Sequence, residues 1–264
     1  MNTKILFFLL LILAACNPSR LEDLIVIADV EEEFIIYPRE VLNTSTPKEL
    51  EWVIVSKNTE PCQNYEIKAR LEKNSTNLSL YIDEITNPDD CIEGEIIPSL
   101  ILNSGKINQT TYNFNITLKK TIENSGHLKK TDNRYTIQIG SENGIDLQHK
   151  ELIAIPNEAL WGYMGWYEGL EADQIASALG KMKDLWPSNN LPSGFYGHFV
   201  IMPGVHHQPA LLELPEYELF QTVLLTKADK NNEAIQQELD LLKSQMGNSG
   251  INIVLFDNTG KVYR

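Results

Sequence analysis

The regular alternation of apolar and polar residues is the feature that most constrains how this chain can fold. Between residues 65 and 72 every second residue is apolar and the others are charged, and residues 111–119 alternate in the same way between apolar and polar residues. A period of two places successive side chains on opposite faces of an extended strand, so one face is buried and the other meets water. Residues 30 to about 150 show no helical period, and we expect this half of the chain to be β-sheet.

Further strand candidates follow at short intervals, at residues 32–38, 50–56, 78–83, 95–102 and 134–140. Spacers rich in Asn, Pro, Ser, Thr and Gly separate them, and these residues favour turns. Many short strands divided by turns predict an antiparallel β-sandwich domain, which we assign to residues 28–148.

In outline this half resembles an immunoglobulin-like or fibronectin-III-like domain. Tyr112, two residues before Phe114 in the clearest late strand, stands where such domains place a tyrosine corner. The cysteines Cys62 and Cys91 depart from the immunoglobulin pattern, because they do not bracket a tryptophan and Trp52 precedes both. The resemblance therefore implies the sandwich fold and nothing more specific.

The second half of the chain changes character. Residues 171–186 and 231–247 carry apolar side chains at helical spacing, and Asn231 and Gly247 suit the two ends of the second helix. Strand-like segments precede, separate and follow these helices, although residues 217–226 also fit a helix. We expect a multi-domain chain in which residues 149–264 form an α+β domain after the sandwich. A ferredoxin-like arrangement is one option for this domain.

The N-terminus indicates where the protein is located. Residues 5–15 are apolar behind Lys4 and rise about 16 Å as a helix, which is too short for a bilayer core of ~30 Å but suits a secretory signal. The end of this run, Leu13 to Cys16, resembles the lipobox of bacterial lipoproteins. The alternative is an ordinary secretory signal with an incidental cysteine.

The lipobox resemblance implies a sequence of processing steps. Residues 1–15 would be a cleaved signal peptide, Cys16 would carry acyl chains such as palmitate, and residues 16–27 would form a lipidated tether. Asn17 resembles an outer-membrane sorting signal. We therefore expect a lipid anchor in the bacterial outer membrane, with the protein on its periplasmic or its cell-surface face.

The charge of the chain limits its expected binding partners, and its cysteines predict a disulfide. The formal net charge of −14 at pH 7 gives no basic surface for a phosphate backbone, so we expect no nucleic acid. An exported compartment is oxidising, and Cys62 and Cys91 are therefore predicted to form a disulfide. Two free thiols are the alternative.

A cluster of aromatic residues is the first candidate site. Trp161, Tyr163, Trp166 and Tyr167 lie in a segment with three glycines, and flat aromatic faces can stack on sugar rings. If the segment is extended, Trp161, Tyr163 and Tyr167 point one way and Trp166 the other. The alternative is that these rings wedge the two domains together.

A group of histidines is the second candidate site. His198, His206 and His207 lie close in sequence, with Glu213 and Glu216 downstream, and such residues bind zinc or copper. The alternative is a solvated loop.

The sequence contains none of the familiar catalytic motifs, such as G-x-S-x-G or H-E-x-x-H. We expect a non-enzymatic envelope lipoprotein without a cofactor, acting as a binding or structural/adhesion module for a protein or glycan. The alternative is an envelope enzyme or metal-binding protein with its site in the C-terminal domain.

Overall fold

The predicted alternation is present in the structure of the chain, a computed structural model that describes residues 30–204, 208–213, 215, 217–247 and 250–264. Along strand β8 (Thr111–Leu118), Tyr112, Phe114, Ile116 and Leu118 are buried and the residues between them are more exposed. The protein is mainly β-sheet with two helices in the described residues.

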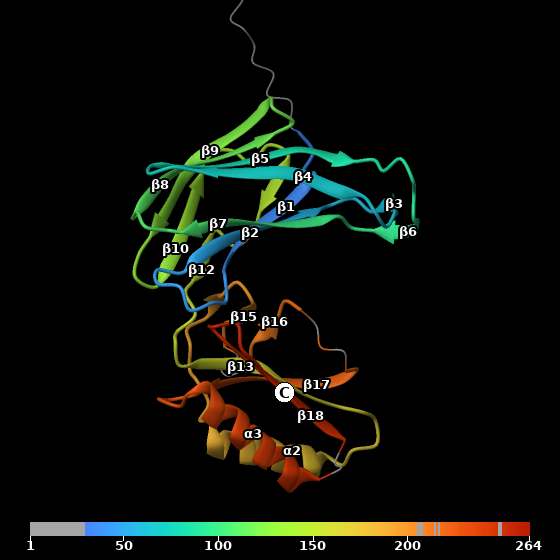
Figure 1. Cartoon of the computed structure of the whole chain (residues 1–264), viewed down its shortest axis with the longest axis vertical. Helices are drawn as coiled ribbons and strands as arrows, with labels where there is room; N and C mark the ends of the chain where they lie inside the picture. The colour runs from blue at the N-terminus through green and yellow to red at the C-terminus, as the bar shows by residue number, and fades with distance from the viewer. Residues whose placement is uncertain (1–29, 205–207, 214, 216, 248–249) are drawn as a thin grey trace, which may run out of the picture. The chain divides into compact units, whose positions relative to one another are not determined.

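Two sheets make up the first part of this arrangement (Figure 1). The four-stranded sheet has the order β11 (Ile145–Leu147), β1 (Phe34–Glu40), β2 (Glu49–Ser56), β7 (Ser99–Lys106). The six-stranded sheet has the order β12 (Glu151–Ile153), β10 (Arg134–Ile139), β9 (Ile122–Lys130), β8, β5 (Asn77–Thr86), β4 (Glu66–Lys73).

One apolar core lies between these sheets, as expected for a β-sandwich. Trp52 of β2 stacks on Phe114 of β8 with ring centroids 4.5 Å apart, so the two sheets are in direct contact. Most strand pairs are antiparallel, as predicted, but two are parallel: β1 with β11, and β5 with β8. The prediction of a purely antiparallel sandwich is wrong at these two pairs.

Two differences from the predicted strands have local causes. The candidate 95–102 is divided, with Pro98 between β6 (Glu93–Ile96) and β7, and β6 pairs with β3 (Glu60–Cys62). A proline has no N–H for a strand ladder, which accounts for the break. Strand β9 was not predicted, because its sequence IENSGHLKK does not alternate.

The position of Gly126 in β9 explains part of that irregular sequence. A Cβ on Gly126 would lie 1.9 Å from the carbonyl oxygen of Gln138 in the neighbouring strand. Only glycine fits such a close backbone approach.

Tyr112 makes the contacts expected of a tyrosine corner. Its hydroxyl accepts hydrogen bonds from the backbone N–H groups of Asn108 and Gln109, each at 3.3 Å. These bonds fix the turn that leads into β8.

The second part of the chain contains both helices, close to their predicted bounds. They are α2 (Ala172–Leu185) and α3 (Asn232–Met246). Asn231 caps α3, since its side-chain oxygen accepts the N–H of Ala234 at 2.9 Å, and Gly247 follows the last turn with a φ of 58°.

A second four-stranded sheet packs against these helices. Its order is β17 (Leu219–Thr226), β13 (Ala159–Trp166), β18 (Ile251–Asp257), β19 (Val262–Tyr263), and all its pairs are antiparallel. Residues 217–226 thus contribute a strand and not a helix. Strands β17 and β18 lie on either side of β13, and α3 connects them along the chain. Together β17, α3 and β18 form one split βαβ unit.

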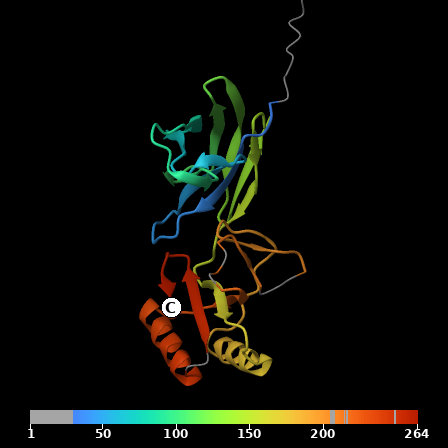
Figure 2. The same ribbon diagram turned by 90° about the vertical axis from the view of Figure 1, so that its right-hand side faces the viewer.

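The helices cover only one face of this sheet. Figures 1 and 2 show both helices on the same side, and a core formed by Leu160, Met164 and Ile253 of the sheet with Met182 and Leu239 of the helices lies between. On the other face lie β14 (Gly194–Phe195), β15 (Phe199–Ile201) and β16 (Ala210–Leu211), which form a small sheet of their own. This face, opposite the helices, carries the candidate site.

The predicted domain boundary at residues 148 and 149 is not a sharp boundary in the structure. Strand β12 pairs with β10, and Leu152 is buried in the core of the sandwich. Phe195 also joins that core. The six-stranded sheet therefore continues beyond the predicted end of the sandwich domain.

Candidate functional site

The sheet face turned away from the helices is hollowed by a cavity of about 580 Å³. Its walls come from β13, β18, the end of β1 and the segment that follows β16. Among the described residues, the polar ones that line it are Arg39, Tyr163, His198, Glu213, Tyr217, Asn252 and Arg264. Among the apolar ones are Trp161, Leu211, Val254 and Phe256. The cavity therefore combines an apolar floor with groups that can form hydrogen bonds.

Trp161 and Tyr163 reach this cavity because β13 is extended and alternates. Trp161 is only 2% exposed and lies 5.2 Å from Phe199 and 6.3 Å from Phe256, measured between ring centroids. It forms the floor of the cavity. Tyr163, two residues along, is half-buried and lines the wall.

The other two predicted aromatic residues lie elsewhere. Trp166 packs against the core on the helix side of the sheet, as the alternation requires. Tyr167 is 71% exposed just beyond the end of β13 and touches the ring of Tyr217 at a centroid distance of 5.3 Å. The four aromatic residues therefore do not form one platform, and Trp161 and Tyr163 alone line the cavity.

His198 also lines the cavity, although its side chain is anchored on the sandwich. Its Nε2 lies 2.8 Å from the backbone oxygen of Glu40. A carbonyl oxygen can only accept, so Nε2 carries the proton and Nδ1 is the acceptor of the neutral ring. Burial is the main cause that lowers the pKa of His198, so the neutral ring is favoured.

The predicted metal site is not assembled within the described residues. His206, His207 and Glu216 lie outside them, and His198 has one ring nitrogen engaged by Glu40. Among the residues that the structure describes, no group of three or more His, Cys, Asp or Glu side chains is placed to hold a metal ion.

Arg39 brings a positive charge from the sandwich to the cavity. Its Nε donates to Oε1 of Glu51 at 2.5 Å, and both side chains are 15% exposed. Its Nη1 lies 4.0 Å from Oε1 of Glu213, a side chain that is 93% exposed. Sequence reasoning missed Arg39, because it lies near the end of an ordinary strand and shows no local motif.

Tyr217 and Asn252 complete one wall and were also missed. The amide nitrogen of Asn252 donates to the hydroxyl of Tyr217 at 2.9 Å. The Tyr217 ring lies directly over Gly165 of β13, where a Cβ would be 2.6 Å from Cγ of the ring. Gly165, one of the three glycines of the aromatic segment, therefore makes room for this ring.

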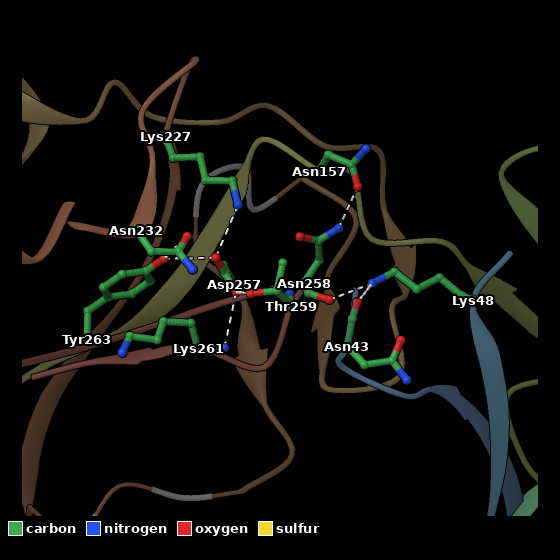
Figure 3. A network of polar contacts seen from close by, with 10 residues as sticks. All are labelled: Asn43, Lys48, Asn157, Lys227, Asn232, Asp257, Asn258, Thr259, Lys261 and Tyr263. Carbon is green, nitrogen blue, oxygen red and sulfur yellow. Dashed lines mark hydrogen bonds and ion pairs between the residues drawn. The ribbon is translucent and has the colours of Figure 1, made fainter. Parts of the chain in front are cut away.

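A buried polar network adjoins this region at the end of β18 (Figure 3). The carboxylate of Asp257 accepts hydrogen bonds from the backbone and hydroxyl of Thr259 and from the backbone of Lys261 through Oδ1. Its Oδ2 accepts from Lys227 at 3.1 Å and from the Tyr263 hydroxyl at 2.9 Å. Burial acts to raise the pKa of Asp257, but these donors together lower it.

The same network reaches the sandwich through Lys48. Its ammonium group donates to the backbone oxygen of Asn258 at 2.7 Å and to the backbone oxygen of Asn43 (Figure 3). The Asn258 side chain in turn donates to Asn157 at 2.6 Å. These bonds tie the turn after β18 to the β1–β2 connection.

Glu40 is a second buried carboxylate, at the end of β1. It accepts a hydrogen bond from the hydroxyl of Tyr135 and another from the backbone N–H of Ile155, both at 3.2 Å. Burial is the main influence on its pKa and raises it. Glu40 therefore joins the sandwich to the start of the second part but does not line the cavity.

Cys62 and Cys91 are joined by a disulfide, as predicted. The bond joins β3 to the segment just before β6, and β3 and β6 also pair with each other. Its role is structural, and neither cysteine lines the cavity. Cys16 and the rest of the predicted tether lie outside the described residues.

Comparison with family models, curated proteins and solved structures yields no match for this chain. Among the described residues, no helix has the length and apolar character needed to cross a membrane. The cavity and its lining are therefore the basis for a functional proposal.

Proposed function

We propose that this protein is a non-enzymatic ligand-binding lipoprotein of the bacterial envelope. Residues 1–15 are its signal peptide, Cys16 its acylated residue and residues 16–27 its tether to the outer membrane. The sandwich at 28–148 serves as a spacer, and the α+β domain at 149–264, with one half of a ferredoxin-like arrangement, provides most of the binding site.

The observation that carries the binding function is the cavity of about 580 Å³ that Trp161, Tyr163 and His198 line together. Ligand sites commonly have volumes of roughly 300–1,000 Å³, with an apolar lining and a few polar groups that fix orientation. Because Trp161 is a buried floor and Trp166 faces the helices, this geometry favours a ligand held inside the cavity. It does not favour a sugar stacked across the two tryptophans.

A pair of tyrosine variants tests the binding function. Ligands are screened as a panel of saccharides, short peptides and organic acids by the shift in melting temperature and by tryptophan emission. Tyr163→Ala should weaken binding of any hit by roughly tenfold, since an aromatic wall is lost. Tyr65→Ala removes a partly exposed tyrosine beside the disulfide, which does not line the cavity, and should leave binding unchanged.

Hits that bind the two variants equally would show that the cavity is not the site. A panel without a single hit would likewise count against a small-ligand function.

The anchor and location have their own test. Cys16→Ala should abolish acylation and release the protein from membranes, and protease treatment of intact cells should show which face of the outer membrane carries it. Membrane association of Cys16→Ala protein after a salt wash would contradict the lipid anchor.

A further inference from the structure

The charges around the cavity differ from those of the chain as a whole. The protein has a formal net charge of −14, yet the described residues that line the cavity include two arginines, Arg39 and Arg264, and one carboxylate side chain, Glu213. Glu213 is 93% exposed and is therefore well solvated, whereas Arg39 is mostly buried. Arg39 is paired with the equally buried Glu51, and Arg264 is exposed, so the described lining presents two guanidinium groups, of which Arg264 has no ion pair with another described residue.

The guanidinium of Arg39 has donors to spare. Its Nε–H is used by Glu51, but the distance of 4.0 Å from Nη1 to Glu213 is too long for a hydrogen bond. Within the described part of the chain no hydrogen bond from either terminal nitrogen is found. Neither terminal nitrogen is fully buried, so both can donate to a ligand in the cavity that supplies acceptor oxygens.

The stem of Arg39 is held in place by close packing. Gly197, with a φ of 83°, lies against it, and a Cβ on this glycine would be 2.6 Å from Cβ of Arg39. The ion pair with Glu51 fixes the other end of the side chain. A planar guanidinium held in this way matches the two oxygens of a carboxylate.

The rest of the cavity suits an apolar group. Trp161 and Phe256 lie with an angle of 24° between their rings, and Val254 and Leu211 extend this apolar surface. A ligand that satisfies both regions must carry an anionic end and an apolar body.

We infer that the cavity binds a carboxylate attached to an aromatic or aliphatic body, with the carboxylate on Arg39 and Arg264 and the body over Trp161 and Phe256. Because Glu51 already balances Arg39, a single negative charge fits better than the double charge of a phosphate. The inference rests on the proposed binding function and specifies its ligand class. Such a carboxylate occurs in free organic acids and at the C-terminus of a peptide.

A matched pair of probes tests the charge requirement. We would titrate the full protein with 3-phenylpropanoate and with the neutral 3-phenylpropanamide, following heat release and tryptophan emission. A carboxylate held by charged donors should bind roughly tenfold more tightly than its amide. Tyr163→Ala should weaken both probes.

Arginine variants then locate the carboxylate. Arg264→Gln and Arg39→Lys, which keeps the charge beside Glu51, should each weaken the acid by roughly fivefold and leave the amide unchanged. Arg134→Gln, an exposed arginine paired with Glu151 away from the cavity lining, is the control and should change neither. Melting temperatures confirm that each variant is folded.

Equal affinity for acid and amide, with both sensitive to Tyr163→Ala, would overturn the carboxylate inference while the binding function stands. Binding of neither probe at the highest soluble concentration would also overturn the inference. If both probes bind and Tyr163→Ala weakens neither, the carboxylate inference and the proposal that this cavity is the binding site are both overturned.

A further comparison, between two peptides, distinguishes the two sources of a carboxylate. The tripeptide alanyl-alanyl-phenylalanine is compared with its C-terminal amide. Tighter binding of the free-acid peptide than of 3-phenylpropanoate supports a protein C-terminus as the ligand. Binding of the small acid without the peptide supports a free organic acid.

Discussion

Asp257 and Glu40 are both buried carboxylates that accept a hydrogen bond from a tyrosine, yet their surroundings shift their pKa values in opposite directions. Asp257 is bonded by Tyr263, Thr259, Lys227 and the backbone of Lys261. Among the described residues, the donors to the Glu40 carboxylate are the Tyr135 hydroxyl and the backbone N–H of Ile155. Burial is the largest influence on both groups, but only at Asp257 do the donors outweigh it.

The hydroxyl and the backbone N–H of Thr259 lower the pKa of Asp257 most, followed by the hydroxyl of Tyr263 and the ammonium group of Lys227. Lys227 lies 3.1 Å from Asp257, whereas the lysines that act on Glu40, Lys48 and Lys130, donate to backbone oxygens instead. Asp257 is therefore a stabilising charge, and Glu40 is a charge whose burial is incompletely compensated.

The largest expected effect comes from removing the charge of Asp257. Asp257→Asn leaves Lys227 facing an amide and should lower the free energy of unfolding by about 3 kcal/mol, since one partner of a buried ion pair is lost. Chemical denaturation measures the change. Asp229→Asn, an exposed aspartate, is the control and should change stability by no more than ~0.5 kcal/mol. Similar losses in both variants would show that the Asp257 network is not stabilising.

The pH dependence of stability sharpens the comparison. The pKa of Asp257 is lower in the folded protein, so its contribution is present above the unfolded pKa of about 3.9 and is lost as the pH falls through the folded value. The difference between wild type and Asp257→Asn should therefore shrink on acidification. A difference that stays constant down to the acid transition would contradict the lowered pKa.

Glu40 should give a smaller effect of the opposite sign. Its raised pKa means that its contribution is present below the unfolded pKa and is lost as the pH rises through the folded value. Glu40→Gln has no carboxylate to ionise, and its amide can still accept from the N–H of Ile155 and donate to the hydroxyl of Tyr135. The free energy of unfolding of this variant at pH 8 should therefore be higher than that of the wild type by on the order of 1 kcal/mol. Unfolding curves at pH 8 and pH 5 test this, with a smaller gain expected at pH 5. A loss at both values would show that the carboxylate is needed there.

Local patterns in the sequence predicted much of the fold. Both helices begin and end within a residue or so of the predicted bounds, because Asn231 and Gly247 mark the ends of α3 and the apolar spacing marks both. The strands were predicted where side chains alternate. Strand β9 was not, because its form depends on the close approach of Gly126 to β10, which is a tertiary contact.

The candidate site was predicted only in part, for a related reason. Trp161, Tyr163 and His198 were noted because aromatic and histidine side chains are recognisable in any sequence. Their meeting was not predicted, because His198 is held by a backbone oxygen 158 residues away. Arg39 and Tyr217 carry no local pattern and become relevant only once the chain is folded.

The parallel pairing of β1 with β11 has a mechanical consequence. Phe34 to Ile36 lie in register with Ile145 to Leu147, and flanking backbone bonds join Glu33 to Gly144 and Gln148 to Ile36. If the chain is held before β1 and pulled from beyond β11, the two strands must slide past each other, so these bonds share the force and break together. An antiparallel hairpin pulled at its open end breaks one bond at a time. If the protein is tethered at its N-terminus, tension applied in this way would load the β1–β11 pair in shear.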